Sequence, residues 1–134
     1  MDARQVVQEF CDGMVKRDAE ALRMYLADDV VYQNTGMEAA VGIDATLESL
    51  AFQVSMFPTS YEYKTVNIVA DGGLVLTERL DMIAGPDGVA HGVPVMGAFE
   101  VTDGKITRWT DYFDTALPAK MLSGEDYSAL VPKH

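Results

Sequence analysis

The sequence predicts an α+β fold, with helices in its first half and an antiparallel sheet in its second. Up to Phe57, apolar residues recur at helical spacing; from Tyr61 onward they alternate with polar residues in segments separated by glycine-containing turns. Helices and strands in separate parts of a chain are typical of α+β domains, because βαβ units would alternate them. The length predicts one domain over 1–134, large enough for a core and a pocket.

Two packed helices are expected to open the fold. The first covers about 3–16 and the second 18–26, because apolar residues fall on one face of each. Asp18 is the expected N-cap of the second helix, since its carboxylate can accept a bond from the first turn. The apolar faces are made by Val6, Val7, Phe10 and Met14, and by Leu22, Tyr25 and Leu26.

A short strand and a third helix follow. The strand covers 30–34 and leads into a loop over 35–42. The third helix covers about 44–57 with Asp44 as its expected N-cap, and Pro58 ends it because proline lacks the backbone N–H that a helix interior needs. Its apolar stripe is made by Leu47, Leu50, Val54 and Phe57.

The second half is expected to form an antiparallel meander of four strands. If its last turn is a three-residue loop, Val101 pairs with Lys105, and Gly97 lies opposite Trp109, where a glycine leaves room for the indole. The strands cover 61–70, 74–84, 89–101 and 105–114, with turns at 71–73, 85–88 and 102–104.

Three polar pairs interrupt the strands: Tyr32 with Asn34, Arg79 with Asp81, and Trp109 with Asp111. Residues i and i+2 of a strand point to the same side, so each pair directs both members into one space. Alone, the pairs also fit a strand end with a turn residue, an exposed edge ion pair, and a strand-end aspartate beside a core indole. Together they indicate a buried acid/base site, because burying uncompensated ions costs on the order of several kcal/mol each.

The two faces of the sheet are expected to differ. The opposite face of the 74–84 strand carries Leu74, Leu76, Leu80 and Met82, which are too apolar for water. Since the helices cover only one face, we expect a homodimer through this outer face; the alternative is a monomer whose C-terminal segment folds over it. The inner face is expected to hold Val75, Thr77, Arg79, Asp81, Ile83, Val93, Val95, Gly97, Phe99, Thr107, Trp109, Asp111 and Phe113.

Charge and composition disfavour several classes of partner. The net charge of −11 argues against nucleic acid and against an anionic membrane surface, because both require clustered cations. No apolar run reaches the roughly 20 residues of a membrane span. The single cysteine, Cys11, forms no internal disulfide and is most simply a small buried apolar residue. With no basic and apolar leader, a cytoplasmic protein is expected.

No cofactor and no metal ion are expected. His91 is the only internal histidine, and catalytic zinc sites usually use three protein ligands. We expect His91 to pack neutrally or to lie at a pocket mouth. No glycine-rich loop precedes a helix to hold phosphate, and no G-x-S-x-G motif supplies a nucleophile. Met56 and Met96 are candidates to lie near a substrate.

The segments VYQN (31–34), TERLDMI (77–83) and RWTDYFD (108–114), in this order and at these separations, resemble the limonene epoxide hydrolase family. The resemblance runs from the first helix to about residue 117 and includes the family's five polar catalytic positions. It implies a cone-like fold of the cystatin-like, nuclear transport factor 2-like or SnoaL-like type, usually dimeric. In this fold a strongly curved, mostly antiparallel mixed sheet wraps around a deep pocket and is covered by three N-terminal helices. The loop over 35–40 lacks the family's prolines, which bears on the shape of the pocket.

The resemblance also implies roles for individual residues. Asp81 is the acid that protonates the epoxide oxygen, and Asp111 is the base that deprotonates the attacking water. Tyr32 and Asn34 hold that water, and Arg79 bridges the two aspartates. The residues expected to line the pocket around the substrate are Trp109, Phe113, Val95, Ile83, Val93 and Phe57.

The predicted function is a cofactor-independent epoxide hydrolase that adds water to an apolar, cyclic or terpenoid-like epoxide and gives a vicinal diol in one step. The leaving oxygen gains a proton while water loses one, so two carboxyls that share one proton suit the reaction. The alternatives are an isomerase or cyclase on the same fold, including one that opens an epoxide with the substrate's own hydroxyl, and a non-catalytic small-molecule-binding dimer. Arg79 between two aspartates favours hydrolysis, because a ketosteroid-type isomerase needs an uncharged donor pair.

Overall fold

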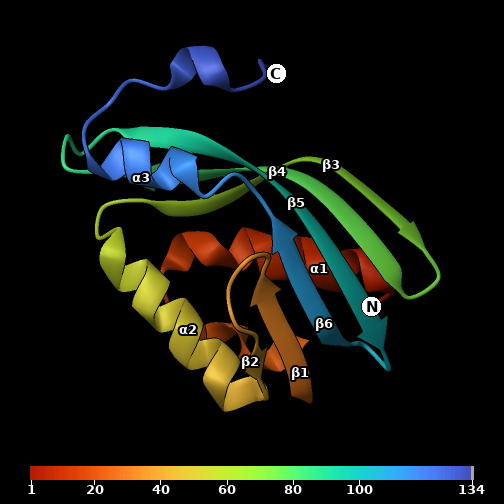
Figure 1. Ribbon diagram of the computed structural model, residues 1–134. Helices are drawn as coiled ribbons and strands as arrows, with labels where there is room; N and C mark the ends of the chain where they lie inside the picture. Colours follow the sequence, from red (N-terminus) through yellow and green to blue (C-terminus); the bar gives the residue numbers. More distant parts are fainter. Residues whose placement is uncertain (134) are drawn as a thin grey trace.

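The computed structural model describes residues 1–133 and has the predicted α+β class (Figure 1). No helix in this range is both long and apolar enough to cross a membrane. Along the chain the elements are α1 (Ala3–Asp12), η1 (Gly13–Lys16), η2 (Ala19–Tyr25), β1 (Leu26–Asn34), β2 (Ala40–Val41), α2 (Ile43–Met56), β3 (Tyr61–Asp71), β4 (Leu74–Ala84), β5 (Ala90–Thr102), β6 (Lys105–Tyr112), α3 (Ala116–Leu122) and η3 (Ser128–Leu130).

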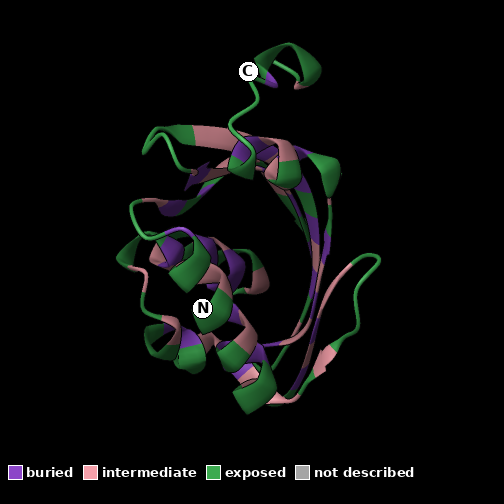
Figure 2. Ribbon diagram, turned by 60° about the vertical axis from the view of Figure 1, so that its left-hand side comes forward, coloured by how far each residue is buried: buried purple, intermediate pink, exposed green. Residues whose placement is uncertain are grey.

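The strands form one mixed sheet in the order β2-β1-β6-β5-β4-β3. β1 runs parallel to β6, and every other neighbouring pair is antiparallel. The long strands β3 to β6 curve around α1 and α2, and α3 lies at one end of the sheet (Figures 1 and 2). This arrangement confirms the predicted curved sheet and the predicted meander of β3 to β6.

The core lies between α1 and the concave face of the sheet. A capping box between Asp2 and Gln5 starts α1. Phe10 on this helix packs edge-on against Phe99 and Trp109, and all three side chains are completely buried. Burial of such side chains contributes about 1.5–3 kcal/mol each, so this contact holds the helix on the sheet. The buried face of α1 consists of Val6, Val7, Phe10 and Cys11.

The first two predicted helices differ from their predicted form. The α-helix ends at Asp12 and continues as a 3₁₀ turn, and the second predicted helix is the 3₁₀ helix η2. Arg17 adopts a left-handed conformation with φ of 54°, which interrupts the helical path between η1 and η2. Asp18 is the N-cap residue of η2, as predicted, but its carboxylate does not make the expected cap bond.

The third helix begins at a different residue from the predicted one. Gly42 is the N-cap of α2, with φ of 93° that favours glycine, and Asp44 lies in the first helical turn. The Asp44 carboxylate instead accepts a bond from Arg23 at 3.2 Å. Leu47, Leu50 and Phe57 are buried as predicted.

The turn between β5 and β6 has two residues rather than the predicted three. Asp103 and Gly104 both have positive φ, as in a type I′ hairpin, so Thr102 pairs with Lys105. A bulge at Thr107 then shifts the register, since Val101 pairs with Ile106 and Glu100 with Arg108. The predicted pairing of Val101 with Lys105 is therefore wrong, and so is the predicted inward position of Thr107; Ile106 is buried in its place.

The outer face of the sheet remains apolar and exposed. Leu74 and Leu76 are 41% and 40% exposed. Within residues 1–133 the C-terminal segment reaches this face only near Gly92, whose carbonyl accepts from the Tyr127 hydroxyl and which lies beside Leu80 and Met82. It leaves Leu74 and Leu76 uncovered, so the predicted alternative of a C-terminal cover is not met at these two residues.

Candidate active site

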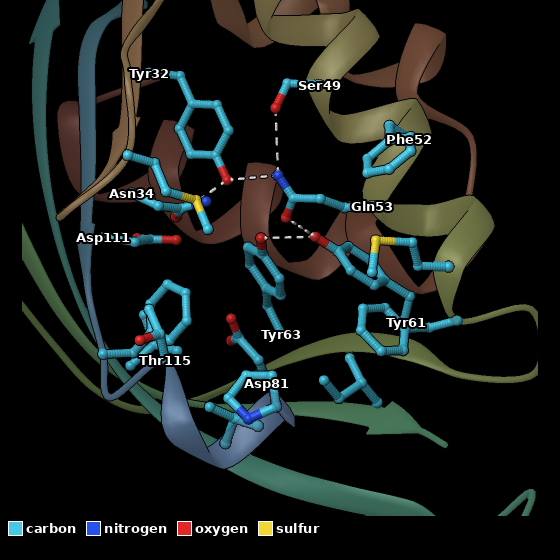
Figure 3. Close-up of a pocket in the computed structure, with 18 of the residues that line it drawn as sticks. Tyr32, Asn34, Ser49, Phe52, Gln53, Tyr61, Tyr63, Asp81, Asp111 and Thr115 are labelled. Atoms are coloured by element: carbon cyan, nitrogen blue, oxygen red, sulfur yellow. Dashed lines mark hydrogen bonds between the residues drawn. The ribbon is translucent and has the colours of Figure 1, made fainter. Parts of the chain in front are cut away.

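A cavity of about 410 Å³ opens between α2, the concave face of the sheet and the start of α3 (Figure 3). Its polar wall residues include Tyr32, Asn34, Asp81 and Asp111, all from the predicted site. Five of the predicted apolar lining residues face it: Phe57, Ile83, Val93, Val95 and Phe113. The remaining apolar wall is made by Met37, Ala40, Phe52, Met56 and Pro118.

Arg79 holds the two aspartates of this wall at fixed positions. Its guanidinium donates to Asp81 from Nε and Nη2, both at 3.0 Å. It donates to Asp111 from Nη1 at 3.0 Å and from Nη2 at 2.9 Å. The Arg79 side chain is 0% exposed and lies behind both carboxylates, which face the cavity. Charge-assisted bidentate bonds of this kind set geometry strongly, so the separation of the two carboxyl groups is rigid.

The path from Arg79 to Asp111 exists because β5 carries a glycine there. Gly97 pairs with Thr77 on β4 and with Asp111 on β6, not with Trp109 as predicted. A Cβ on Gly97 would lie 2.6 Å from Arg79 Nη1 and 3.0 Å from Asp111 Oδ1. Any larger residue would push the guanidinium away from the carboxylate of Asp111, so the contact between Arg79 and Asp111 requires glycine at this position.

Trp109 supports the site from behind and does not line the cavity, contrary to the prediction. Its side chain is completely buried, and its Nε1 donates to Asp111 Oδ1 at 2.9 Å. Its indole stacks on the Tyr32 ring with centroids 3.8 Å apart. The indole therefore fixes both a carboxylate and a phenol of the wall.

Tyr32 and Asn34 reach the site because β1 pairs with β6 in parallel. In this register Tyr32 lies beside Trp109 and Asn34 beside Asp111. The Tyr32 hydroxyl donates to Asn34 Oδ1 at 3.3 Å. The i, i+2 spacing on neighbouring strands thus brings the phenol, the amide and the carboxylate to one part of the wall.

The wall holds further polar residues outside the predicted site, and three of them, Gln53, Tyr61 and Tyr63, are linked to the site by contacts. Tyr61 and Tyr63 form another i, i+2 pair, so the same spacing rule identifies them. The Tyr63 ring lies against the guanidinium of Arg79, with Cζ 4.2 Å from the ring centroid. Gln53 lies on α2, whose apolar stripe gave no sign of a polar contact across the cavity.

Two other predicted positions lie away from the cavity. Met96 lies on the outer face and is half exposed, although Met56 does line the cavity. His91 neither lines the cavity nor packs in the core, because its Nε2 contacts Asp87 Oδ2 at 2.9 Å on the surface. Within residues 1–133, no three histidine, cysteine, aspartate or glutamate side chains lie together as metal ligands would.

The electrostatics of the site favour a shared proton. Burial raises the pKa of Asp81, Arg79 opposes that rise, and the nearby Asp111 charge adds to it; together these effects bring the pKa of Asp81 to about 6. Two carboxylates beside one guanidinium would leave one negative charge in a mostly apolar cavity, and one proton neutralises it. The arrangement can therefore present one carboxylic acid and one carboxylate to the same bound molecule.

Comparison with known proteins places this geometry among related chains. A family model described as the limonene-1,2-epoxide hydrolase catalytic domain matches residues 1–124. The chain is 39% identical over 109 residues to epoxide hydrolase EphG of Mycobacterium tuberculosis, covering 81% of this chain and 70% of the relative. A solved structure described as an M. tuberculosis LEH-like epoxide hydrolase is 33% identical, with a TM-score of 0.76 over 98% of this chain and 96% of the other.

The fold extends to more distant structures. One described as a SnoaL-like polyketide cyclase from Jannaschia sp. CCS1 has a TM-score of 0.76 at 17% identity, covering 92% of this chain and 93% of the other. At this identity the likeness concerns the fold alone.

Proposed function

The chain belongs to the limonene-1,2-epoxide hydrolase family and is an epoxide hydrolase, and from this premise we propose that it adds water directly to an apolar epoxide. The observation that carries the proposal is Arg79, buried between two carboxylates that face one cavity. The apolar residues of the wall support a cyclic or terpenoid-like epoxide, whose only polar atom would lie next to the carboxyl groups of Asp81 and Asp111. The product is a vicinal diol.

In the proposed reaction, protonated Asp81 gives its proton to the epoxide oxygen as the C–O bond breaks. Asp111 takes a proton from a water as the water oxygen forms the new bond to carbon. Tyr32 and Asn34 position that water, which reduces the entropy cost of attack. Afterwards Asp81 is ionised and Asp111 is protonated, so one proton must return to Asp81 before the next cycle. The hydrogen bonds of Arg79 keep both carboxyls in place throughout.

The test is a single turnover of cyclic and linear epoxides in ¹⁸O-labelled water. We expect the label in the diol of the first cycle, because water attacks carbon directly. An unlabelled first diol would mean that an enzyme carboxylate supplied the oxygen. A rearranged product without added water would favour an isomerase or cyclase, and unchanged bound epoxide would favour a binding protein.

The proposed acid role of Asp81 predicts a specific pH dependence. Asp81 donates only when protonated, and its pKa is raised to about 6 by burial. Activity is therefore present below pH 6, and kcat/KM is expected to fall by about tenfold per pH unit once the pH has risen through that value. A pH–rate profile of kcat/KM measures this limb. A profile that stays flat from about pH 5 to pH 8 would contradict it.

We further propose that two copies of the chain associate through the outer sheet face. Its exposed apolar residues are Val69, Leu74, Leu76, Met96 and Tyr112. Water contact with an apolar patch of this kind is unfavourable, and a second copy would remove it. Sedimentation velocity should show a dimer that Leu76→Glu converts to a monomer; a monomeric native chain would rule the assembly out.

A further inference from the structure

A continuous series of hydrogen bonds runs along the cavity wall beside the two aspartates, since Tyr63 pairs with Asp81 and Asn34 pairs with Asp111. The Tyr63 and Tyr61 hydroxyls lie 3.1 Å apart, and Tyr61 donates to Gln53 Oε1 at 3.0 Å. Gln53 Nε2 donates to the Tyr32 hydroxyl oxygen at 2.9 Å, and Tyr32 donates to Asn34 Oδ1 at 3.3 Å (Figure 3). These five residues, from Tyr63 to Asn34, are called the Gln53 chain below.

The amide of Gln53 determines the direction of the bonds in the Gln53 chain. An amide nitrogen only donates and an amide oxygen only accepts. The Tyr32 oxygen must therefore accept a hydrogen bond from Gln53, and the Tyr32 hydroxyl donates its own hydrogen bond to Asn34. At the other end Tyr61 must donate to Gln53, so it is Tyr63 that donates to Tyr61. All three tyrosines are buried, which protects these bonds from competing water.

This direction decides what Tyr32 offers to an attacking water. A phenol has one proton and two lone pairs. The hydroxyl hydrogen of Tyr32 is used in the bond to Asn34, and Gln53 donates to one lone pair, so Tyr32 has only one acceptor position left. A water that donates one hydrogen to Tyr32 and the other to Asp111 keeps a lone pair for the epoxide carbon. If Tyr32 donated to the water instead, it would occupy one of the two lone pairs of the water and draw electron density from its oxygen, so the water would be a poorer nucleophile.

We propose that Gln53 is a positioning residue for epoxide hydrolysis, which acts by holding Tyr32 as an acceptor toward the nucleophilic water. The inference rests on the proposed function and adds a residue on α2 to it. Among the described residues Gln53 makes no hydrogen bond to either aspartate; its partners are Tyr32, Ser49 and Tyr61, and of these Tyr32 is the one that reaches the proposed water. Tyr61 supports Gln53 by keeping its amide oxygen engaged.

A double-mutant cycle tests the proposal through kcat. Gln53→Leu is expected to lower kcat by about fivefold to tenfold with little change in KM, because it removes the bonds that orient Tyr32. In a Tyr32→Phe background the same substitution is expected to change kcat by less than about twofold, because no hydroxyl remains to be oriented. Tyr61→Phe should give a smaller loss than Gln53→Leu, and this loss should also vanish in the Tyr32→Phe background.

Equal losses of kcat from Gln53→Leu in both backgrounds would overturn the proposal, and so would no loss in either. If Gln53→Leu does not fold, Tyr61→Phe completes the same cycle, and circular dichroism checks each variant. Tyr127→Phe is the matched control, since it removes a buried phenol hydroxyl outside the cavity wall; its effect should be the same in both backgrounds. The ¹⁸O experiment on the native enzyme distinguishes failure of the proposed function from failure of the Gln53 proposal. If the native enzyme forms labelled diol but the kcat losses from the Gln53 and Tyr32 substitutions are independent, only the role of Gln53 fails.

Discussion

Asp111→Asn is expected to lower kcat for epoxide hydrolysis by about 100-fold to 10,000-fold, the usual contribution of a general base. Asparagine keeps the shape of the side chain and one oxygen that can accept from Trp109 Nε1 and Arg79 Nη1. Its NH2 group cannot accept from Arg79 Nη2, as the second carboxylate oxygen does, and it cannot take a proton from water. The cavity wall is otherwise unchanged, so affinity for an unreacted epoxide or a diol should persist. Turnover by product analysis and binding by calorimetry measure the two effects separately.

Asp71→Asn is the matched control for this prediction. Asp71 ends β3 in an exposed position, so the same loss of a carboxylate there should leave kcat unchanged. Diol formation at the native rate in Asp111→Asn would refute the role of Asp111 as base. Loss of both binding and folded structure would instead identify Asp111 as a structural partner of Arg79.

Arg79→Met is expected to lower the free energy of unfolding by about 3–5 kcal/mol. The substitution removes one member of a buried ion network and leaves two carboxyls without their donor, which is far costlier than losing a surface pair. Urea unfolding followed by the fluorescence of the single tryptophan, Trp109, measures the change. Diol formation should also be lost, because the separation of Asp81 and Asp111 is no longer fixed.

The stability loss in Arg79→Met should depend on pH in a defined direction. Without the guanidinium, the effect that opposes the rise in the pKa of Asp81 disappears, so that pKa moves further up. A raised pKa in the folded state stabilises the fold only at low pH, and this contribution is lost as the pH rises through the folded value. The variant should therefore approach native stability in acid and differ most above pH 6. Arg108→Met, at a half-exposed pair with Glu100, should cost less than about 1 kcal/mol at any pH.

Much of the fold follows from local patterns in the sequence. The meander is marked by glycine-containing turns, and alternation placed Arg79, Asp81 and Asp111 on one face because side chains in a strand repeat every two residues. The helix and strand types in the first half were harder to predict. Over the seven residues of η2, repeats of 3.0 and 3.6 residues place the same apolar side chains inward, so α- and 3₁₀-helix have the same pattern there.

The details that the sequence did not predict involve backbone geometry and distant contacts. A Thr102-Asp103-Gly104 turn is compatible with a two- or three-residue loop, and the choice depends on whether Asp103 tolerates positive φ. The bulge at Thr107 reverses the inward and outward alternation, which alternation alone cannot reveal. Gln53 appears as one polar residue on a helix; only its contacts with Tyr32 and Tyr61 give it a place in the site.

The reactivity of the buried Cys11 thiol reports how often the core of this protein opens. The thiol is 1% exposed on the inner face of α1, and burial raises its pKa to about 12. Both properties make it unreactive toward alkylating reagents while the helix is in place, since the thiolate is the reactive form. The rate of Cys11 alkylation in the native protein therefore measures how often α1 separates from the sheet near Arg79. Bound substrates or products that tighten the cavity can be ranked by how far they slow that chemistry.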